Sequence, residues 1–584
     1  MKPQMTAFVA ADLYKFDLGV ENGGHITISL AIFSSKSKDF QPEGTLNETQ
    51  LWLSRGLVWY YAFNHEEAIQ CFQKALALGG NPIMAHYWIS VSHGPNYNTE
   101  TMNRDAFPSA KDAFVECQTA LRLLEEDSSY LSEFEIALVK ALPCRFNDPD
   151  AEEFRSMDAI EQNTDAYADA MLSVYQRFPE DPNAACMYAE ALLNKSPWRL
   201  WDLDTGLATP HAVVAEEVLQ KALLVAPNHP GLNHFMVHLM EMSPHPEVSL
   251  PSCAVLRKYF PSAGHLIHMP SHIYVLLGMW QEAADCNIEA WKVDDVYVEK
   301  EGIYNYYTGY RLHNLHFISY AGMFAGRYEE SMRAALEVKR NLPDSLLENP
   351  IMNRFFESFL SIEVHVLIRF GKWTEILGKE IPTDHKLHGH TIATLHYARG
   401  IAHAVLGDTI AAVRDLSLLR KAMTLVGGDH VLHNNLCSDM LAIAEHMLQG
   451  ELYYRLGRYE DAFWELNMAA TLSDELVYDE PWGWMQPPLH ALGALSLEQG
   501  QVENAEKYFR RDMDKSYYGR CHPDNIWALK GLEQCLLRNP VYLPLSENAA
   551  RAAELVEVRS KIAALEVRAD SKIKVACMCA VKKL

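Results

Sequence analysis

The sequence has too little positive charge for a protein that binds nucleic acids or anionic membrane surfaces. Its 584 residues include 51 Lys and Arg against 76 Asp and Glu, which gives a formal net charge of -25. A surface with this excess of negative charge repels phosphate groups. The composition therefore predicts neither a nucleic-acid partner nor a membrane partner.

Membrane-spanning and secretory segments are also missing. No run reaches the roughly 18 apolar residues that a transmembrane helix needs, and the N-terminus lacks the basic-then-apolar order of a signal peptide. The eleven cysteines are scattered, and only Cys577 and Cys579 lie close together. Because this spacing indicates neither a disulfide framework nor a CxxC zinc pair, we expect a cytoplasmic protein in a reducing compartment.

The motifs of several common enzyme classes are absent. No GxSxG, GxGxxG or GxxxxGKS stretch occurs, which excludes the simplest nucleophile, dinucleotide and nucleotide sites. The stretch HFMVH (234–238) places Phe235 where a zinc protease of the HExxH type has its catalytic Glu. A peptidase of that type would therefore lack its base.

What the sequence does contain is an internal repeat. Residues 51–82 carry the small and large side chains that two antiparallel helices need to pack closely, namely Trp52, Gly56, Ala68, Phe72, Ala75 and Pro82. A Gly, a second Gly seven residues later and an Ala five residues after that recur three times, at Gly400, Gly407 and Ala412, at Gly450, Gly457 and Ala462, and at Gly493, Gly500 and Ala505. The pattern resembles the tetratricopeptide repeat.

This resemblance implies an all-α fold, a solenoid of helical hairpins wound into a right-handed superhelix with a concave inner face. Strand-like sequence is nearly absent, and ITISLAIF (26–33) is the clear exception. We expect an N-terminal segment outside the array at 1–44, the solenoid at 45–570, and a flexible C-terminal tail at 571–584.

Three stretches rich in Pro, Gly and aromatic residues interrupt the helical pattern. They are GPNYN (94–98), SPWRLWD (196–202) and DEPWGWMQPP (479–488). We expect them to form turns or inserted loops between hairpins. None has the composition of a linker, so the sequence predicts no division into independent domains.

Histidines recur at equivalent places in three neighbouring repeats. When the repeats are aligned on Ser249, Ala283 and Ser331, a histidine lies fifteen residues before each of the three. A further histidine lies eleven residues before the first two of these positions, and another lies eighteen residues before the last two. The set lies within residues 230–320 and comprises His234, His238, His265, His268, His272, His313 and His316. Offsets of three, four and seven place these side chains on one face of the first helix of each hairpin. In the tetratricopeptide family that face lines the concave groove.

The histidine set predicts a transition-metal site. Neutral imidazole is the commonest metal ligand, and two histidines four residues apart on a helix can bind one ion. Nitrogen ligands suit copper, then iron, then zinc in our order of preference, and Glu241 would complete the two-His-one-carboxylate set of iron(II) oxygenases. A metal-free acid–base site and a purely structural set remain open, since His490 occupies the same offset alone in a distant repeat.

Longer stretches resemble one family within the repeat class. FNHEEA, HPGLNHFMVHLMEMSPHPE, GHLIHMPSHIY, HNLHF and DEPWGW are similar to motifs of large tetratricopeptide proteins from bacteria and fungi, most of which have no assigned activity. The similarity covers roughly residues 45 to 535. It implies that the seven histidines belong to family motifs, and it implies no reaction.

We expect a metal-dependent oxidoreductase that acts on a small organic molecule, by analogy in secondary metabolism. Glu241 and Tyr310 are the predicted catalytic residues, and His268 is the predicted central ligand. The aromatic residues expected beside the pocket are Trp198, Trp201, Tyr304, Tyr306 and Tyr307. Two alternatives stay open, a non-catalytic scaffold that binds protein partners in its groove and a zinc-dependent hydrolase. For imidazole ligands we expect metal affinity to fall between about pH 7 and 5.

Overall fold

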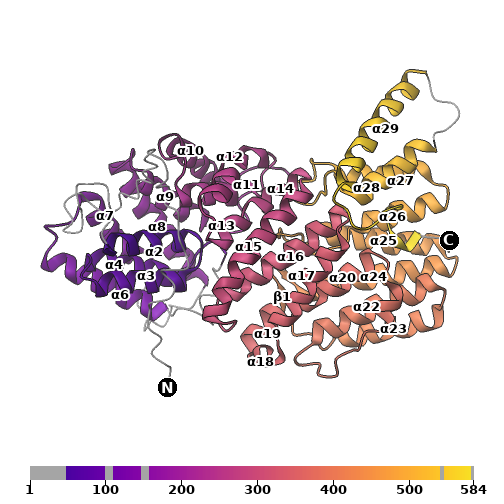
Figure 1. Cartoon of the computed structure of the whole chain (residues 1–584), viewed down its shortest axis with the longest axis horizontal. Coiled ribbons are helices and arrows are strands. Elements are labelled where there is room, and N and C mark those ends of the chain that lie inside the picture. The colour runs from indigo at the N-terminus through magenta and orange to yellow at the C-terminus, as the bar shows by residue number, and fades with distance from the viewer. Residues whose placement is uncertain (1–47, 99–109, 147–156, 539–544, 581–584) are drawn as a thin grey trace. The chain divides into compact units, whose positions relative to one another are not determined.

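A computed structural model describes residues 48–98, 110–146, 157–538 and 545–580 (Figure 1). The predicted strand at 26–33 and the segment 1–44 lie outside these ranges. The described chain forms two compact units, where the sequence predicted one array. Unit 1 extends to Ile273 and includes Lys292–Tyr297, and unit 2 comprises Tyr274–Trp291 and the chain from Val298 onward. The boundary falls inside helices, which explains why the sequence contains no linker there.

Unit 1 is built of helices. They are α2 (Glu48–Tyr61), α3 (His65–Ala77), α4 (Pro82–His93), α6 (Ala110–Glu126), α7 (Glu133–Ala141), η1 (Leu142–Cys144), α8 (Met157–Arg177), α9 (Pro182–Leu193), α10 (Pro210–Val225), α11 (Pro230–Met240), η2 (Pro246–Ser249), α12 (Leu250–Tyr259) and α13 (Gly264–His268). Two further helices, α14 (Pro270–Leu277) and α15 (Trp280–Glu301), contain the unit boundaries.

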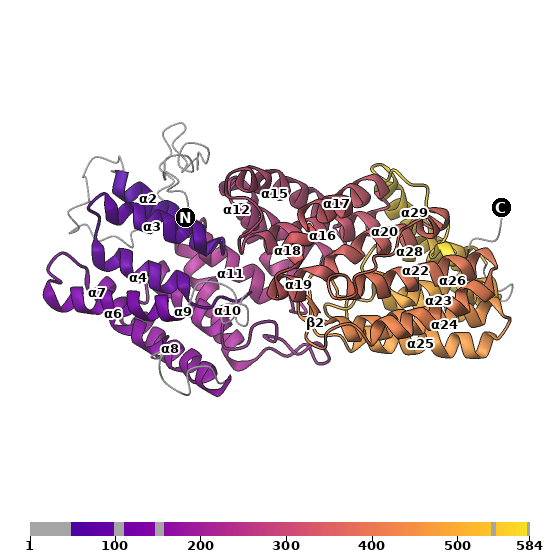
Figure 2. The same ribbon diagram turned by 90° about the horizontal axis from the view of Figure 1, so that it is seen from below.

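Unit 2 continues the helical pattern, and Figure 2 shows α22 to α25 running alongside one another. Its helices are α16 (Thr308–Ala325), α17 (Tyr328–Asn341), α18 (Asp344–Leu347), α19 (Pro350–Phe356), η3 (Glu357–Ser361), α20 (Ile362–Arg369), α21 (Trp373–Leu377), α22 (Gly389–Leu406), α23 (Thr409–Met423), α24 (Cys437–Arg455), α25 (Tyr459–Asp474), α26 (Pro488–Glu498), α27 (Val502–Met513), α28 (Ile526–Leu537), α29 (Leu545–Glu566) and η4 (Met578–Ala580). The short strands β1 (Val431–Leu432) and β2 (Asn435–Leu436) pair antiparallel.

Several helices of unit 1 begin at a capping side chain that is followed by proline. Asn81 accepts a hydrogen bond from the backbone N–H of Met84 at the start of α4, and Thr209 accepts one from Ala212 at the start of α10. Proline occupies the first helical position in both, where its missing N–H costs nothing and its fixed φ suits a helix. The sequence thus marks where each helix starts.

The repeated glycines lie where the two helices of a hairpin touch. A Cβ on Gly56 would lie 2.4 Å from the ring of Phe72, and one on Gly493 would lie 2.4 Å from the ring of Phe509. The aromatic residue follows sixteen positions after the glycine in both hairpins. The four predicted hairpins are α2–α3, α22–α23, α24–α25 and α26–α27. The all-α fold of tetratricopeptide-type hairpins is confirmed.

Replacing Gly493 with Ala will destabilise unit 2. The added Cβ overlaps the buried ring of Phe509, so the hairpin must shift, and we expect a loss of about 1–3 kcal/mol in the free energy of unfolding, as for other overpacked cores. Gly428→Ala is the matched control because open space surrounds that glycine. Urea unfolding measures both, and equal midpoints for the two variants would contradict the packing.

The predicted interruptions are loops. Residues 94–98, 196–202 and 479–487 lie outside helices, and an isolated bridge pairs Trp201 with Ala208. Cys577 and Cys579 form a disulfide, and the other nine cysteines are free. Among the described residues, no helix has both the length and the apolar character needed to span a membrane.

The C-terminal segment differs from the predicted flexible tail. Asp570 accepts hydrogen bonds from the backbone N–H groups of Tyr328 (2.7 Å) and Glu329 (2.8 Å), at the start of α17. The backbone N–H of Ser571 donates to the carbonyl oxygen of Gly326, and Ile573 and Cys579 are buried. Residues 571–580 are therefore packed against other parts of unit 2. The partners lie more than two hundred residues away, so no local pattern signals this contact.

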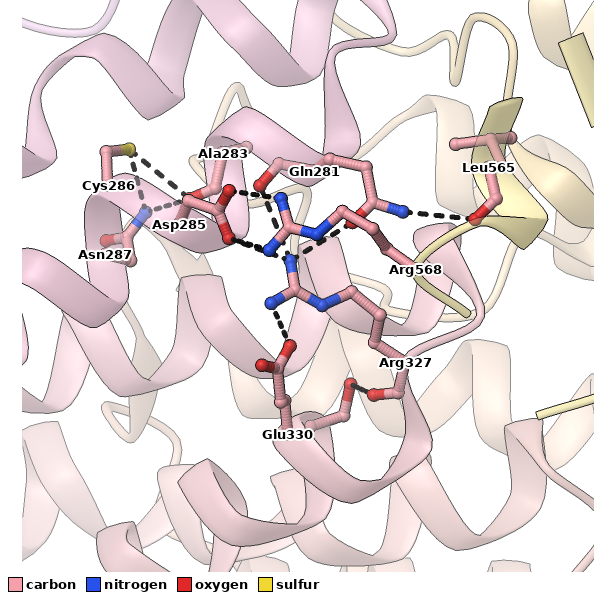
Figure 3. Close-up of polar contacts among 10 residues, drawn as sticks. Gln281, Ala283, Asp285, Cys286, Asn287, Arg327, Glu330, Leu565 and Arg568 are labelled. Atoms are coloured by element: carbon pink, nitrogen blue, oxygen red, sulfur yellow. Dashed lines mark hydrogen bonds and ion pairs between the residues drawn. The ribbon is translucent and has the colours of Figure 1, made fainter. Parts of the chain in front are cut away.

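An arginine pair strengthens the same attachment (Figure 3). Asp285 of α15 accepts hydrogen bonds from Nη1 of Arg327 (3.1 Å) and from Nη2 of Arg568 (2.7 Å). The two guanidinium groups lower the pKa of the Asp285 carboxyl. The amide of Gln281 donates to the carbonyl oxygen of Leu565 (3.4 Å), so the end of α29 is joined to α15 and to the start of α17.

Candidate metal centre

Five of the seven predicted histidines lie in unit 1 on three helices, α11, α13 and α14. His234 and His238 lie one turn apart on α11, His265 and His268 lie on α13, and His272 lies on α14. The helix α13 ends at His268 and α14 begins at Pro270, so a single residue separates the two short helices. Each of the five side chains is at most 1% exposed. The cluster is therefore buried within unit 1.

His234, His238 and His265 form the first candidate ligand set. One nitrogen of each lies within 4.8 Å of the others. Nδ1 of His234 lies 2.6 Å from the carbonyl oxygen of Tyr61, to which it donates as Nδ1–H, and this leaves the Nε2 lone pair free in the neutral ring. Among the described residues, neither Nε2 of His234 nor Nε2 of His238 has a hydrogen-bond partner. Buried polar atoms without partners are rare, and a metal ion would satisfy both.

Glu241 lies behind two of the imidazoles. Both of its carboxylate oxygens are 3.1 Å from Nδ1 of His238, and Oε2 is 2.8 Å from Nδ1 of His272. A carboxylate in this position accepts both Nδ1–H bonds, so it fixes the tautomers and directs both Nε2 lone pairs away from itself. His238, Glu241 and His272 also have ligand atoms within 4.8 Å of one another. The geometry thus gives Glu241 an orienting position, while its predicted catalytic role stays a prediction.

His268 and His272 form a close pair. Their Nε2 atoms lie 2.7 Å apart, a distance at which the two nitrogens share one proton when no ion is bound. The Ser271 hydroxyl donates to the carbonyl oxygen of His268 (2.8 Å). His268 was predicted to be the central ligand, but within unit 1 it is His238 that belongs to both ligand sets.

Burial keeps the imidazoles of His234, His238 and His265 uncharged at neutral pH. Desolvation lowers the pKa of His234 to about 3, and it lowers the pKa of His238 and His265 well below the ordinary range, with neighbouring imidazoles adding to the effect. Neutral rings keep their lone pairs available for a metal. The loss of metal affinity between pH 7 and 5 was predicted for ordinary imidazoles. Because the pKa values of these three histidines are lowered, we now expect that loss at lower pH.

Aromatic side chains surround the cluster. The ring of Phe63 lies 4.5 Å from that of His234 and 5.4 Å from that of His265, and the ring of Tyr97 lies 4.5 Å from that of His238. Trp198 contacts His238 at 6.1 Å, beside the cluster as predicted. Phe63 and Trp198 have φ values of 56° and 61°, which non-glycine residues rarely adopt and which concentrate at functional sites.

Sequence reasoning missed Phe63 and Tyr97. Phe63 lies in the turn between α2 and α3, directly before the N-cap Asn64, and Tyr97 lies in the loop after α4. Both positions are far from α11 in sequence, so periodicity could not connect them with the histidines. The predicted Trp201 donates its indole N–H to the carbonyl oxygen of Leu239 on α11 (2.7 Å).

The other two predicted histidines belong to unit 2, where they contact a third. Nε2 of His433 lies 3.3 Å from Nδ1 of His313 and 3.2 Å from Nδ1 of His316. His433 lies in the turn between β1 and β2 with a φ of 50°. The sequence prediction missed it, because the repeat register does not extend to that turn.

The tyrosines predicted beside the pocket lie just before α16 and in its first turn, and their place beside a pocket stays a prediction. In unit 2, Tyr306 and Tyr310 are buried, with their hydroxyl oxygens 3.5 Å apart, and Tyr307 packs beside Tyr310 at 5.5 Å between ring centroids. Tyr304, by contrast, is 66% exposed and its hydroxyl bonds to that of Ser345. The short loop that precedes α16 turns this one ring outward. The catalytic role of Tyr310 stays a prediction.

No family model and no curated protein matches the sequence. Among solved structures, the chain is similar to a human IFIT1 dimer with PPP-AAAA, at 11% identity and a TM-score of 0.30, over 89% of this chain and 96% of that one. It is also similar to yeast Tom70, at 13% identity and a TM-score of 0.26, over 84% and 96% of the two chains. The Cut9–Hcn1 assembly of APC/C matches at 12% identity and a TM-score of 0.23, over 88% and 96%.

Proposed function

We propose that unit 1 binds a transition-metal ion through His234, His238 and His265, and that the protein is a metal-dependent oxidoreductase acting on a small organic molecule. The observation that carries the proposal is a pair of fully buried imidazole nitrogens, Nε2 of His234 and Nε2 of His238, with no hydrogen-bond partner among the described residues and a third imidazole within 4.8 Å. A metal ion accounts for lone pairs that burial would otherwise leave unsatisfied.

Copper is the ion that this donor set favours most. The ligands are nitrogens only, because the Glu241 carboxylate already accepts the Nδ1–H bonds of His238 and His272. All-imidazole ligation suits copper, whereas iron(II) oxygenases require a coordinating carboxylate. Iron and then zinc follow in our order. The close pair His268 and His272 supplies two further nitrogens for a second ion or for hydrogen bonds to substrate.

The chain's own residues would position the substrate and exclude water. A bound copper ion supplies one-electron chemistry and a coordination position for oxygen or substrate. Phe63, Tyr97 and Trp198 present aromatic surfaces against the imidazoles, which favours a flat or apolar substrate. Glu241 holds the His238 ring in one tautomer, so its Nε2 keeps its direction throughout turnover.

The wider family resemblance shapes the biological part of the proposal. The histidine-bearing stretches resemble those of large bacterial and fungal tetratricopeptide proteins, and by this analogy we place the activity in secondary metabolism. Nine of the eleven cysteines are free and one pair, Cys577 and Cys579, forms a disulfide, and from the excess of free cysteines we propose a cytoplasmic location. A zinc-dependent hydrolase and a metal-free scaffold for protein partners are the competing functions, and the following experiment separates all three.

Copper(II) added to the purified chain will give an electron paramagnetic resonance signal that ascorbate removes and air restores, because the proposed site cycles between two oxidation states. The zinc-loaded protein will show no such cycle. A copper signal that ascorbate does not change, or a reduced protein that air does not reoxidise, would rule out the oxidoreductase and favour the hydrolase. Absence of copper and zinc binding would leave the scaffold.

A further inference from the structure

A pocket opens in unit 2, and the empty space at it, open solvent included, is about 510 Å³. Residues from α20, α22, α24 and α26 line it, and the C-terminal segment Cys577–Cys579 forms one side. Most of its wall is apolar, with Ile401, Met447, Leu466 and Ala491 among the lining side chains. The pocket shares no lining residue with the histidine cluster of unit 1, and nothing in the proposed oxidoreductase uses it.

Arg369 introduces a buried cation into this apolar wall. The residue is 6% exposed, and its guanidinium stacks on the ring of Trp527 at 4.0 Å. Among the described residues, its one hydrogen bond runs from Nη2 to Nδ1 of His490 (2.7 Å). Arginine carries five N–H donors, so the remaining donors are available to a ligand in the pocket.

Within the part of the chain that the structure describes, no carboxylate contacts Arg369 directly. His490 accepts the guanidinium bond at Nδ1 and donates from Nε2 to Asp512 (2.7 Å), so the neutral imidazole separates the two charges. Asp512 also accepts hydrogen bonds from His522 (2.9 Å) and Asn525 (2.9 Å), which satisfies its oxygens. A buried guanidinium normally pairs with an anion, because an uncompensated charge is costly in a low-dielectric interior. The pocket is the place where such an anion fits.

The other charged residue of the pocket does not oppose an anion. Glu451 pairs with Arg455 at 2.7 Å, and burial raises the pKa of the Glu451 carboxyl. Both effects reduce the free negative charge at that wall. Gln486 is already engaged, since its amide donates to the carbonyl oxygen of His365 and accepts from the Tyr397 hydroxyl. Arg369 is therefore the group that decides the charge of the ligand.

We propose that this pocket binds a small carboxylic acid with an apolar body, with the carboxylate on the Arg369 guanidinium and the apolar part against Met447, Leu466 and Ala491. The planar guanidinium matches a carboxylate through two parallel hydrogen bonds. The apolar wall selects against highly polar acids. The proposal concerns unit 2 alone and does not depend on the metal site of unit 1.

Isothermal titration of the full chain with 3-phenylpropanoate and with 3-phenylpropanamide tests the proposal. The two probes have the same apolar body and differ in charge, so the acid should bind at least about ten-fold more tightly than the amide. Arg369→Met should remove this preference, because methionine keeps the apolar stem and lacks the donors. Arg414→Met is the matched control, since Arg414 is an exposed residue of α23 and should leave acid binding unchanged.

Three outcomes would overturn the proposal. They are no binding of the acid to the unmodified chain, equal affinity for the acid and the amide, and unchanged acid affinity in a folded Arg369→Met variant. If Arg369→Met does not fold, the comparison of acid with amide on the unmodified chain decides the matter. Repeating the titration on His238→Ala separates this site from the metal centre, because acid binding in unit 2 should survive loss of the ligand.

Discussion

Replacing His238 with Ala will abolish stoichiometric copper binding by unit 1. His238 belongs to both ligand sets of this unit, and its Nε2 is one of the two buried nitrogens without a hydrogen-bond partner among the described residues. Removing it takes one ligand from the three-histidine set and leaves Glu241 with His272 alone. Titration of the chelator-treated protein with copper(II) measures the loss, and we expect affinity to fall by more than the roughly 10–100-fold typical of a residue that only orients a ligand.

The controls for this variant address stability. His238 is fully buried, so its truncation should cost about 2–5 kcal/mol, as for other large buried side chains. This exceeds the modest loss that a groove-facing histidine would show. His390→Ala is matched in burial and lies in unit 2, so it should cost similar stability and leave copper binding intact. A folded His238→Ala protein that binds copper like the unmodified chain would contradict the ligand assignment.

Glu241→Gln tests the orienting role separately. The amide keeps the size of the side chain but accepts fewer hydrogen bonds, so one of the His238 and His272 rings loses its fixed tautomer. We expect copper affinity to fall by about 10–100-fold without loss of the site. Complete loss of binding in a folded Glu241→Gln protein would indicate that the carboxylate itself coordinates the ion.

Acidification will strongly destabilise the metal-free protein. In unit 1, burial lowers the pKa of His65, His229 and His234 to about 3, whereas an unfolded chain protonates histidine near its ordinary pKa of about 6.5. Between these values the unfolded state binds protons that the folded state cannot. The stability present above about pH 6.5 is therefore lost as the pH falls, at up to about 1.4 kcal/mol per pH unit for each of these histidines.

Glu190 of unit 1 changes stability in the opposite direction. Burial raises the pKa of Glu190, so its contribution to stability increases on acidification. A single carboxyl does not offset three histidines, and we expect the free energy of unfolding to fall by several kcal/mol between pH 6.5 and 5. Denaturant unfolding of the chelator-treated chain at pH 7, 6 and 5 measures this. Unchanged midpoints across the three values would contradict the buried neutral imidazoles.

Much of this architecture could be predicted because it depends on short repeated spacings. Gly56 leaves room for the ring of Phe72, and Gly493 leaves room for the ring of Phe509 in the same way. This repeated pairing of a glycine with an aromatic residue predicts the hairpins from the sequence. The histidine register follows from the same helical geometry, since offsets of three and four residues share a helix face. Five of those histidines do lie together in unit 1.

The remaining features depend on contacts between distant segments. Phe63 and Tyr97 reach the cluster from a turn and a loop, and His433 reaches His313 and His316 from the turn between two short strands. The orienting position of Glu241 depends on His272, which lies 31 residues away on another helix. Local periodicity predicts faces of helices, and it gives no information about which loops cover those faces.

The most direct test of the account is the metal content of the protein as purified. We predict at least one copper or iron ion per chain by elemental analysis, and for copper we predict couplings to imidazole nitrogens in the pulsed electron paramagnetic resonance spectrum. Those couplings should arise from the ligands His234, His238 and His265. A protein that contains no bound transition metal and takes none up from solution would contradict the metal centre and leave the buried histidines a structural role.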